Sequence, residues 1–166
     1  MPLVVSVLES EDFDSLILDA MQVKHLDDVM AIEAQAYTFP WTRSMFVSSL
    51  SSKDVCLILI ADEKIIGYAI FNYIMDEAHL LNICISPDYQ FMGLGRLLLR
   101  RIVLLSIENR SVMFFLEVRS SNTHAIDLYF SEGFNEVGVR PNYYPSEKGR
   151  EDAILMTLDL SLDITV

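Results

Sequence analysis

The hydrophobic positions of this chain recur at helical spacing in some segments and form short apolar runs in others, and these changes predict its elements. Between residues 24 and 37, Leu26, Val29 and Ile32 recur at helical spacing, with Glu33 counted among the polar, solvent-facing residues of the predicted helix. Similar patterns predict strands over 15–21, 55–61, 65–74, 79–85, 112–119, 134–139 and 153–160, and helices over 42–50, 97–109 and 122–132. The stretch 140–152, which contains Pro141 and Pro145, is expected to be a loop.

The predicted order is strand, two helices, three strands, helix, strand, helix and two strands. Antiparallel-type strands followed by crossover units imply an α/β fold, with a mixed, mostly antiparallel central sheet of about seven strands flanked by about four helices. Residues 15–166 are expected to form a single domain. Residues 1–14 carry acidic side chains and no basic one, so they are predicted to be a poorly ordered acidic leader.

Two glycines lie where a predicted strand turns into a predicted helix, in Gln90-Phe91-Met92-Gly93-Leu94-Gly95-Arg96. The first amides of a helix have no partner within the helix and carry the positive end of its dipole, so this turn is suited to an anion. Two nucleotide-binding motifs are excluded, because position 98 is Leu rather than Gly and no Gly-Lys-Ser/Thr follows. A turn that needs its glycines for backbone reasons alone is the alternative interpretation.

The chain has a formal net charge of −12. A nucleic-acid binder needs a basic face to neutralise phosphates, so no direct nucleic-acid partner is expected. An acidic field favours a cationic partner such as an amine or a basic peptide, although the same charge also serves solubility alone.

The cysteines and histidines give no sign of a metal site. Cys56 and Cys84 lie in apolar strand-like runs, as is ordinary for buried free thiols in a reducing cytoplasm. His25, His79 and His124 are too scattered to be metal ligands, so no metal is expected. No basic residue precedes the apolar N-terminal residues, and no apolar run reaches membrane-spanning length. We therefore expect a cytoplasmic protein with no membrane partner, and we expect a monomer.

Glu117 is a candidate general base because it is a carboxylate late in an otherwise apolar strand. Period-two geometry puts Phe115, Glu117 and Arg119 on one face. Apolar surroundings would raise the pKa of Glu117 toward the value that suits a general base near neutral pH. The alternative is a solvated strand end at which Glu117 pairs with Arg119.

Asn122 and Tyr129 are seven residues apart in one predicted helix and therefore share a face. Asn122 is expected to cap the helix, or else to bind a ligand amide. Tyr129 is either an ordinary core aromatic or, where its helix faces a ligand, a proton donor. Other carboxylates compete for the role of base, and Glu77 is the second choice because it begins the strand that leads to the glycine turn.

The turn Gln90-x-x-Gly93-x-Gly95 resembles the acyl-CoA pyrophosphate loop of the GNAT N-acetyltransferase superfamily. Further stretches between about residues 15 and 160 resemble one branch of it, the bacterial ribosomal-protein alanine N-acetyltransferases. These stretches are Phe39-Pro40-Trp41, Asp76-Glu77-Ala78, Asn82-Ile83, Pro87-Asp88-Tyr89-Gln90, Leu116-Glu117-Val118-Arg119, Ser121-Asn122, Leu128-Tyr129, Gly133-Phe134-Asn135 and Asn142-Tyr143-Tyr144-Pro145.

The resemblance implies the GNAT fold and an acetyl-CoA-dependent N-acetyltransferase. Its substrate would be the α-amine of an N-terminal alanine in a small-subunit ribosomal protein, attacking directly in a ternary complex. The resemblance assigns the general base to Glu117 and the general acid to Tyr129. It assigns cofactor binding to the backbone of Ile83, Cys84 and Ile85, to the loop residues Phe91, Met92, Gly93, Leu94, Gly95 and Arg96, and to Asn122. The candidates for substrate binding are Phe39, Trp41, Glu77, Tyr143 and Tyr144, for which ordinary loop packing is the alternative.

One departure concerns the loop, since Phe91 stands where this family commonly has Arg. Phosphate affinity would then depend on the backbone amides, on Arg96 and on Arg100. An N-terminal amine suits a modest base better than lysine, because its pKa is about 8 against about 10.4. Two alternatives are an acetyltransferase for small amines or polyamines and a non-catalytic acyl-CoA-binding sensor.

Overall fold

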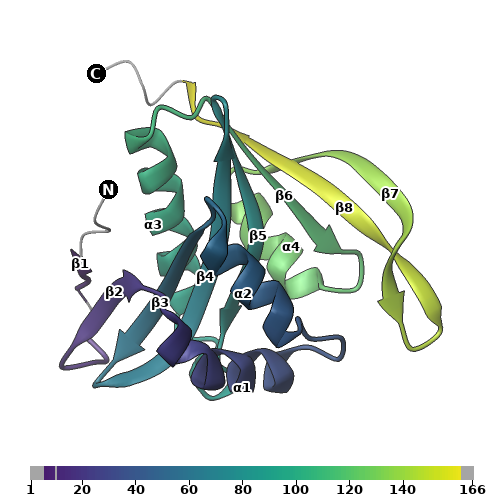
Figure 1. Cartoon of the computed structure of the whole chain (residues 1–166). Helices are drawn as coiled ribbons and strands as arrows, with labels where there is room; N and C mark the ends of the chain where they lie inside the picture. The colour runs from purple at the N-terminus through teal and green to yellow at the C-terminus, as the bar shows by residue number, and fades with distance from the viewer. Residues whose placement is uncertain (1–5, 10, 162–166) are drawn as a thin grey trace. The chain divides into compact units, whose positions relative to one another are not determined.

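The computed structural model describes residues 6–9 and 11–161. Within them, eight strands follow one another in the hydrogen-bonded order β1-β2-β3-β4-β5-β6-β8-β7 (Figure 1). The strands are β1 (Ser6–Val7), β2 (Leu16–Ala20), β3 (Val55–Ala61), β4 (Lys64–Ile74), β5 (Glu77–Ile85), β6 (Met113–Arg119), β7 (Asn135–Ser146) and β8 (Gly149–Asp159). The α-helices of the described residues are α1 (Leu26–Ala36), α2 (Arg43–Ser51), α3 (Leu94–Glu108) and α4 (Thr123–Ser131).

This arrangement confirms the predicted α/β class, with a mixed sheet in which β5 and β6 are parallel, whereas β1–β2, β2–β3, β3–β4, β6–β8 and β7–β8 are antiparallel. The strand count is a correction, because eight strands replace the expected seven. The additional strand, β1, lies in the predicted leader and pairs with β2 through Ser6↔Leu18 and Val7↔Ile17. Residues 1–5 and 10 of that leader lie outside the described residues, and the division at residue 15 stays a prediction.

The described residues fall into two compact units. The first contains the described residues up to Phe71 together with Asn82–Leu98. The second contains Asn72–Leu81 together with the described residues from Leu99 onward. The strands β4 and β5 and the helix α3 each contribute residues to both units.

In the first unit, α1 and α2 lie in front of β3 and β4 in the view of Figure 1. Leu26, Val29 and Ile32 are buried, which confirms the apolar face predicted for α1. Thr42 caps α2 as expected, since its Oγ1 accepts a hydrogen bond of 3.4 Å from the Met45 N–H. Gly67 allows β4 to approach β5 closely, because a Cβ there would lie 2.8 Å from the Cys84 carbonyl oxygen.

In the second unit, β6 alternates as predicted: residues 114, 116 and 118 are buried, while Phe115, Glu117 and Arg119 share the more exposed face. Asn122 caps α4, and Gly133 follows that helix with φ of +90°, as the sequence predicts. The long twisted hairpin of β7 and β8 in Figure 1 corrects the expected loop over 140–152. Pro141 and Pro145 fit in β7 because it is an edge strand with a register irregularity between Arg140 and Tyr144.

Candidate active site

The predicted anion-binding turn connects β5 to α3 in the first unit. Gln90 steadies it by donating a hydrogen bond of 3.0 Å from its Nε2 to the Ile85 carbonyl. Positive φ angles of +62° at Phe91 and +78° at Gly93 redirect the chain into α3. Among the described residues, no atom that could contact a Cβ at Gly93 lies within 4 Å of its position. The space on the Cβ side of Gly93 is therefore open, which leaves room for an anion to approach the amides of the first turn of α3.

The side chains around this turn are mostly uncharged. Phe91, the residue in place of the family's usual arginine, is 83% exposed, and Met92 beside it is also exposed. Arg100 is engaged in the second unit, where its guanidinium forms hydrogen bonds of 2.7 and 3.1 Å with the Glu132 carboxylate. A contribution from Arg100 to phosphate binding would thus compete with this ion pair.

Only the first part of β5 is paired with β6. The register with β6 runs from Glu77↔Met113 to His79↔Phe115 in the described residues, whereas β5 itself continues to Ile85. Farther along, the Ile83 carbonyl accepts a hydrogen bond of 2.8 Å from the Tyr37 hydroxyl. A carbonyl oxygen has two lone pairs, so it keeps capacity for a ligand amide.

Both cysteines are buried and free, as the sequence predicts. Burial, together with the negative charge of Glu33, raises the pKa of the Cys84 thiol to about 12. Burial and the charge of Asp54 raise the pKa of the Cys56 thiol to about 12 as well. Both thiols are protonated at neutral pH, so neither is a ready nucleophile.

Glu33 is the largest departure from the sequence prediction in the first unit, because its side chain is buried rather than solvent-facing, with 2% exposure. Its Oε1 accepts a hydrogen bond of 2.8 Å from the Trp41 N–H. Its Oε2 accepts one of 3.3 Å from Asn82 Nδ2 and another from the Tyr68 hydroxyl. A signal was present in the sequence: Glu33 follows Leu26 by seven residues, which places both on one helix face.

The candidate peptide-slot residues of the first unit have different environments. Trp41 packs against the apolar core with its ring centroid 5.3 Å from that of Phe46. Phe39 is considerably more exposed. The packing of Trp41 therefore agrees in part with the alternative interpretation of ordinary loop packing.

In the second unit, the Glu117 side chain is 28% exposed and its Oε1 lies 3.1 Å from Arg140 Nη1. The partner that the alternative interpretation gave to Glu117, Arg119, lies 2.9 Å from the Glu151 carboxylate instead. Glu77, the second candidate for the base, lies 3.0 Å from His79 Nε2 through its Oε2. Arg140 is a residue that sequence reasoning missed, since nothing in the local pattern indicates a partner so far along the chain.

Tyr143 and Tyr144 pack against each other and against the guanidinium groups of Arg140 and Arg119. The rings of Tyr143 and Tyr144 meet edge to face with centroids 4.9 Å apart. The Arg140 guanidinium lies 5.4 Å from the Tyr143 ring centroid, and that of Arg119 lies 4.5 Å from the Tyr144 centroid. Burial raises the pKa of Tyr144 to about 12, and the nearby Glu117 carboxylate adds to the shift.

Asn122 and Tyr129 both lie where the helix prediction placed them. The Asn122 Oδ1 accepts a hydrogen bond of 3.3 Å from the Ala125 N–H, so its cap role is confirmed and its Nδ2 hydrogens stay available as donors. Tyr129 is buried, with 6% exposure, and packs on Phe134 at a centroid separation of 5.7 Å. Burial raises the pKa of Tyr129, and the neighbouring Tyr144 raises it further.

The structure thus gathers the predicted site residues in two groups, one in each unit. Glu117, Tyr129, Tyr143 and Tyr144 all belong to the second unit, in which the rings of Tyr143 and Tyr144 are in contact. The cofactor strand segment, the glycine turn and Trp41 belong to the first unit, where Glu33 links Trp41 to β5.

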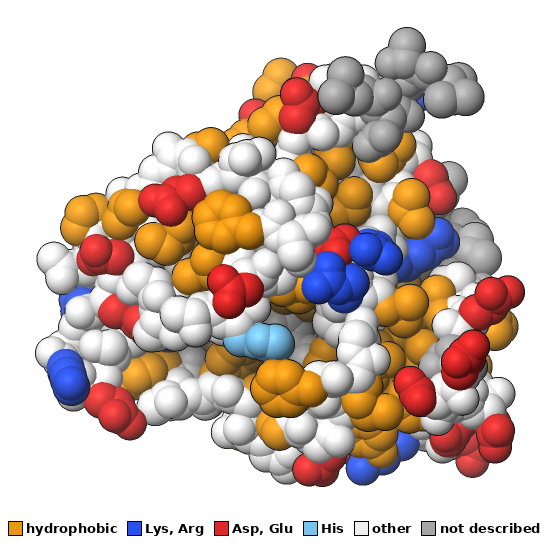
Figure 2. Space-filling view, turned by 180° about the vertical axis from the view of Figure 1, so that it is seen from behind, with side chains coloured by type: hydrophobic (Ala, Val, Ile, Leu, Met, Phe, Trp, Pro, Cys, Tyr) orange, Lys and Arg blue, Asp and Glu red, His pale blue; other side chains and the backbone are white. Residues whose placement is uncertain are grey.

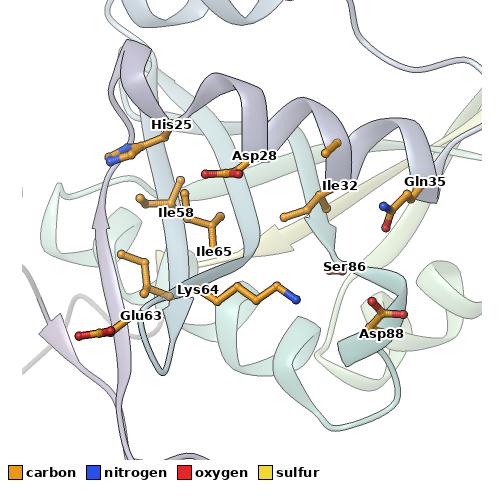
Figure 3. Close-up of a pocket in the computed structure, with 12 residues that line it drawn as sticks. His25, Asp28, Ile32, Gln35, Ile58, Glu63, Lys64, Ile65, Ser86 and Asp88 are labelled. Atoms are coloured by element: carbon orange, nitrogen blue, oxygen red, sulfur yellow. The ribbon is translucent and has the colours of Figure 1, made fainter.

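A separate cavity of about 570 Å³ lies in the first unit. Figure 3 shows residues of α1 on one side and the β3–β4 turn on another, with Lys64 extending toward Ser86 and Asp88. Its lining residues are His25, Asp28, Ala31, Ile32, Gln35, Ile58, Ile60, Glu63, Lys64, Ile65, Ser86 and Asp88. None of the predicted catalytic or cofactor-binding residues is among them, so this cavity is distinct from the glycine turn.

The surface reflects the acidic composition. On the face shown in Figure 2, Asp and Glu side chains are spread among hydrophobic and uncharged ones rather than gathered in one patch. Within the described part of the chain, no helix has the length and apolar character needed to cross a membrane.

Two features fit a protein that binds an acyl-CoA. One is the open space at the glycine turn before α3, and the other is that β5 continues to Ile85, beyond the part that pairs with the parallel strand β6. A family model described as Acetyltransferase (GNAT) family matches residues 26–134. The chain therefore belongs to the Acetyltransferase (GNAT) family, which uses acetyl-CoA.

Its curated relatives narrow the comparison. The [ribosomal protein bS18]-alanine N-acetyltransferase of Salmonella typhimurium is 45% identical over 132 residues, which are 79% of this chain and 88% of that protein. The enzyme of the same name from Escherichia coli K12 is 42% identical over 146 residues, which are 87% of this chain and 98% of that protein.

Solved structures agree with this assignment. The crystal structure of the ribosomal-protein-S18-alanine N-acetyltransferase from Escherichia coli has a TM-score of 0.83 and 40% identity, covering 88% of this chain and 94% of that one. A GNAT family acetyltransferase from Elizabethkingia anophelis with acetyl-CoA bound has a TM-score of 0.72 at 20% identity, covering 89% of this chain and 99% of that one. The second likeness shows the fold alone.

Proposed function

We propose that this chain transfers an acetyl group from acetyl-CoA to the α-amine of an N-terminal alanine in a small-subunit ribosomal protein. The observation that carries the proposal is the identity of 42% over 98% of the length of the Escherichia coli [ribosomal protein bS18]-alanine N-acetyltransferase. An acceptor of this kind is a protein N-terminus, and the net charge of −12 favours a basic one.

Most of the proposed cofactor-binding residues belong to the first unit, and Asn122 belongs to the second. The amides at the start of α3 and the open space at Gly93 suit a diphosphate. The backbone of Ile83, Cys84 and Ile85 would pair with the amides of the pantetheine arm, and the Asn122 Nδ2 hydrogens would add a further contact. Loop residues Phe91, Met92, Leu94, Gly95 and Arg96 frame the phosphates. Acetyl-CoA supplies an acyl group already activated as a thioester.

Glu117 is the proposed general base. Its partial exposure admits a water molecule, and Arg140 engages Oε1 while Oε2 stays available as an acceptor. The carboxylate takes the proton of the attacking amine through that water. An α-amine needs little help, since about a tenth of it is already neutral at pH 7.

Tyr129 is the proposed proton donor to the leaving sulfur. Its raised pKa keeps the hydroxyl protonated throughout the neutral range. The same shift makes complete proton loss less favourable, so the main contribution of Tyr129 is a hydrogen bond donated from its hydroxyl. Phe39, Trp41, Glu77, Tyr143 and Tyr144 are the proposed contacts of the acceptor peptide.

The state of the cysteines supports direct attack by the amine. With a thiol pKa of about 12, as for Cys84 and Cys56, only about one molecule in 10⁵ is a thiolate at neutral pH. A covalent acyl-cysteine route would need that thiolate. The amine therefore forms the new bond to the acyl carbon in the same complex in which the bond to sulfur breaks.

The test is a panel of acceptors offered to the purified chain with acetyl-CoA. It contains a peptide with N-terminal alanine, the same peptide with a blocked N-terminus and an internal lysine, and spermidine. We expect acetylation of the free N-terminus, located by tandem mass spectrometry. Turnover on spermidine alone would replace the proposal with a small-amine acetyltransferase, and saturable CoA binding without turnover would replace it with a sensor.

A further inference from the structure

The Glu33 carboxylate is a buried acceptor surrounded by neutral donors. Among the described residues, its donors are the Trp41 N–H, Asn82 Nδ2 and the Tyr68 hydroxyl. No Lys or Arg of the described residues forms an ion pair with it. A buried carboxylate without a cation is unfavourable unless it is hydrogen-bonded, so Glu33 depends on these donors.

The donors come from three different elements of the first unit. Trp41 lies in the loop between α1 and α2, which also contains Phe39, another of the proposed peptide contacts. Asn82 lies in β5 immediately before Ile83, the start of the proposed cofactor segment. Tyr68 lies in β4. One carboxylate thus connects the peptide-slot loop to the cofactor strand.

A second hydrogen bond joins the same two segments. The hydroxyl of Tyr37, the residue directly after α1, donates to the Ile83 carbonyl at 2.8 Å. Trp41 itself packs on Phe46, whose ring meets that of Tyr68 edge to face at 5.7 Å. The loop is therefore held at its beginning by Tyr37 and farther along by Glu33.

We propose that Glu33 is a positioning residue that holds the α1–α2 loop against β5, so that the acceptor peptide meets a preformed slot beside the cofactor strand. This inference rests on the proposed function. Holding reacting groups in place before they meet is a large part of catalysis of a two-substrate transfer. Glu33 acts through Trp41 and Asn82 and touches neither substrate.

The substitutions Glu33→Gln and Glu33→Ala differ in whether the three groups that donate to Glu33 keep a hydrogen-bond partner. Glu33→Gln keeps an oxygen for the Trp41 N–H, which can only donate. Its amide hydrogens can be accepted by Tyr68 and Asn82, since a hydroxyl can accept and a side-chain amide can turn over. Glu33→Ala leaves all the donors without a partner. The matched control is Val29→Ala, because Val29 is fully buried on the same helix and has no polar atom in its side chain.

The first readout is fluorescence, because Trp41 is the single tryptophan of the chain. In Glu33→Ala we expect acrylamide quenching to rise about twofold or more and the emission to shift to the red, since a freed loop exposes the indole. Glu33→Gln and Val29→Ala should quench like the wild type. Unchanged quenching in Glu33→Ala, or an equal rise in Val29→Ala, would overturn the proposal.

The second readout is the KM for each substrate, measured separately. Glu33→Ala should raise the KM for the alanine peptide about tenfold while the KM for acetyl-CoA changes less than about threefold. Glu33→Gln should restore the peptide KM. A parallel rise of both constants, as expected from general destabilisation in Val29→Ala, would show a merely structural role.

These readouts separate the two proposals. A wild-type chain that acetylates no peptide contradicts the proposed function, while the fluorescence result still decides whether Glu33 holds the loop. Where Glu33→Ala does not fold, Glu33→Asp replaces it, because the shorter carboxylate cannot reach the Trp41 N–H and Asn82 together. The same rise in quenching is expected of it, and wild-type quenching in Glu33→Asp would overturn the proposal.

Discussion

Two glutamates, one in each unit, have opposite environments. Glu33 is 2% exposed and its partners are neutral donors. The Glu117 side chain is 28% exposed, and its partner is the Arg140 guanidinium. Both residues stand in apolar sequence surroundings, and local pattern alone did not predict this difference.

The two environments suit the two carboxylates to different roles. Glu33 is buried and accepts hydrogen bonds from three neutral donors, so it is suited to hold elements together rather than to exchange protons with solvent. Glu117 has access to water and keeps one oxygen unengaged, so it can take up and release a proton during a reaction.

The largest effect is expected from Glu117→Gln. We expect kcat/KM for the alanine peptide to fall about 10²–10³-fold, because the proton acceptor is lost while the shape is kept. Steady-state kinetics measures it, with Glu136→Gln as the control, since Glu136 is an exposed residue of β7. Wild-type turnover in Glu117→Gln would mean that Glu117 is not the general base.

A smaller effect is expected from Tyr129→Phe. Without the hydroxyl, kcat should fall about 10–10²-fold while the KM for acetyl-CoA stays within about threefold. Tyr73→Phe is the control, because it also deletes a phenol of the second unit, one that donates 3.2 Å to the Leu105 carbonyl. An equal loss of kcat in both variants would mean that the Tyr129 hydroxyl acts on stability only.

The buried carboxyl group of Glu33 should make the free energy of unfolding depend on pH. Burial raises the pKa of Glu33 above its ordinary value of 4.5, against the opposing hydrogen bonds from Trp41 and Asn82. The folded chain favours the protonated form of Glu33. The contribution of this preference to the free energy of unfolding is therefore fully present below the pKa of Glu33 in the unfolded chain, and it is lost as the pH rises through the pKa of Glu33 in the folded chain. We therefore expect the free energy of unfolding of the wild type to fall relative to that of Glu33→Gln as the pH rises above about 4.5.

Urea unfolding of the two proteins between about pH 4 and pH 8 measures this difference. The sign is specific, because a carboxylate with a lowered pKa would gain stability over the same range. Parallel curves for the wild type and Glu33→Gln would mean that Glu33 is as readily ionised in the folded chain as in the unfolded one.

The smallest effect is expected beside Glu33, at Cys84. With its pKa raised to about 12, the Cys84 thiol should react slowly with iodoacetamide in the folded chain. Turnover of Cys84→Ala should stay within about threefold of the wild type, because no acyl-cysteine forms. A loss as large as that of Glu117→Gln would favour a covalent route and contradict direct attack.

Much of the fold could be predicted from local pattern. Helix caps at Thr42 and Asn122 and the two faces of β6 depend on neighbours a few residues away, and the structure confirms them. The prolines of residues 140–145 were misleading, because their missing N–H groups have no consequence on the outer edge of a sheet. That β7 would be an edge strand could not be read from its own sequence.

The partners of the two glutamates are a matter of tertiary structure. In the sheet, Ala153 of β8 stands between Arg119 of β6 and Arg140 of β7, and its small side chain lets the longer ones reach across. Arg140 can therefore contact Glu117, although the two are far apart in sequence. No periodicity predicts which strand lies beyond the next.

By itself, the sequence determined the succession of helices and strands, the glycine turn, the family and the residues proposed for acid and base. Those features arise from interactions within a few residues or from a shared pattern of residue types. Only the tertiary structure decided that Glu33 is buried, that Glu117 faces Arg140 and that Trp41 is tied to β5. The physical reason is that burial and hydrogen-bond partners are set by segments that meet only after folding, and these set the free energy of a charge.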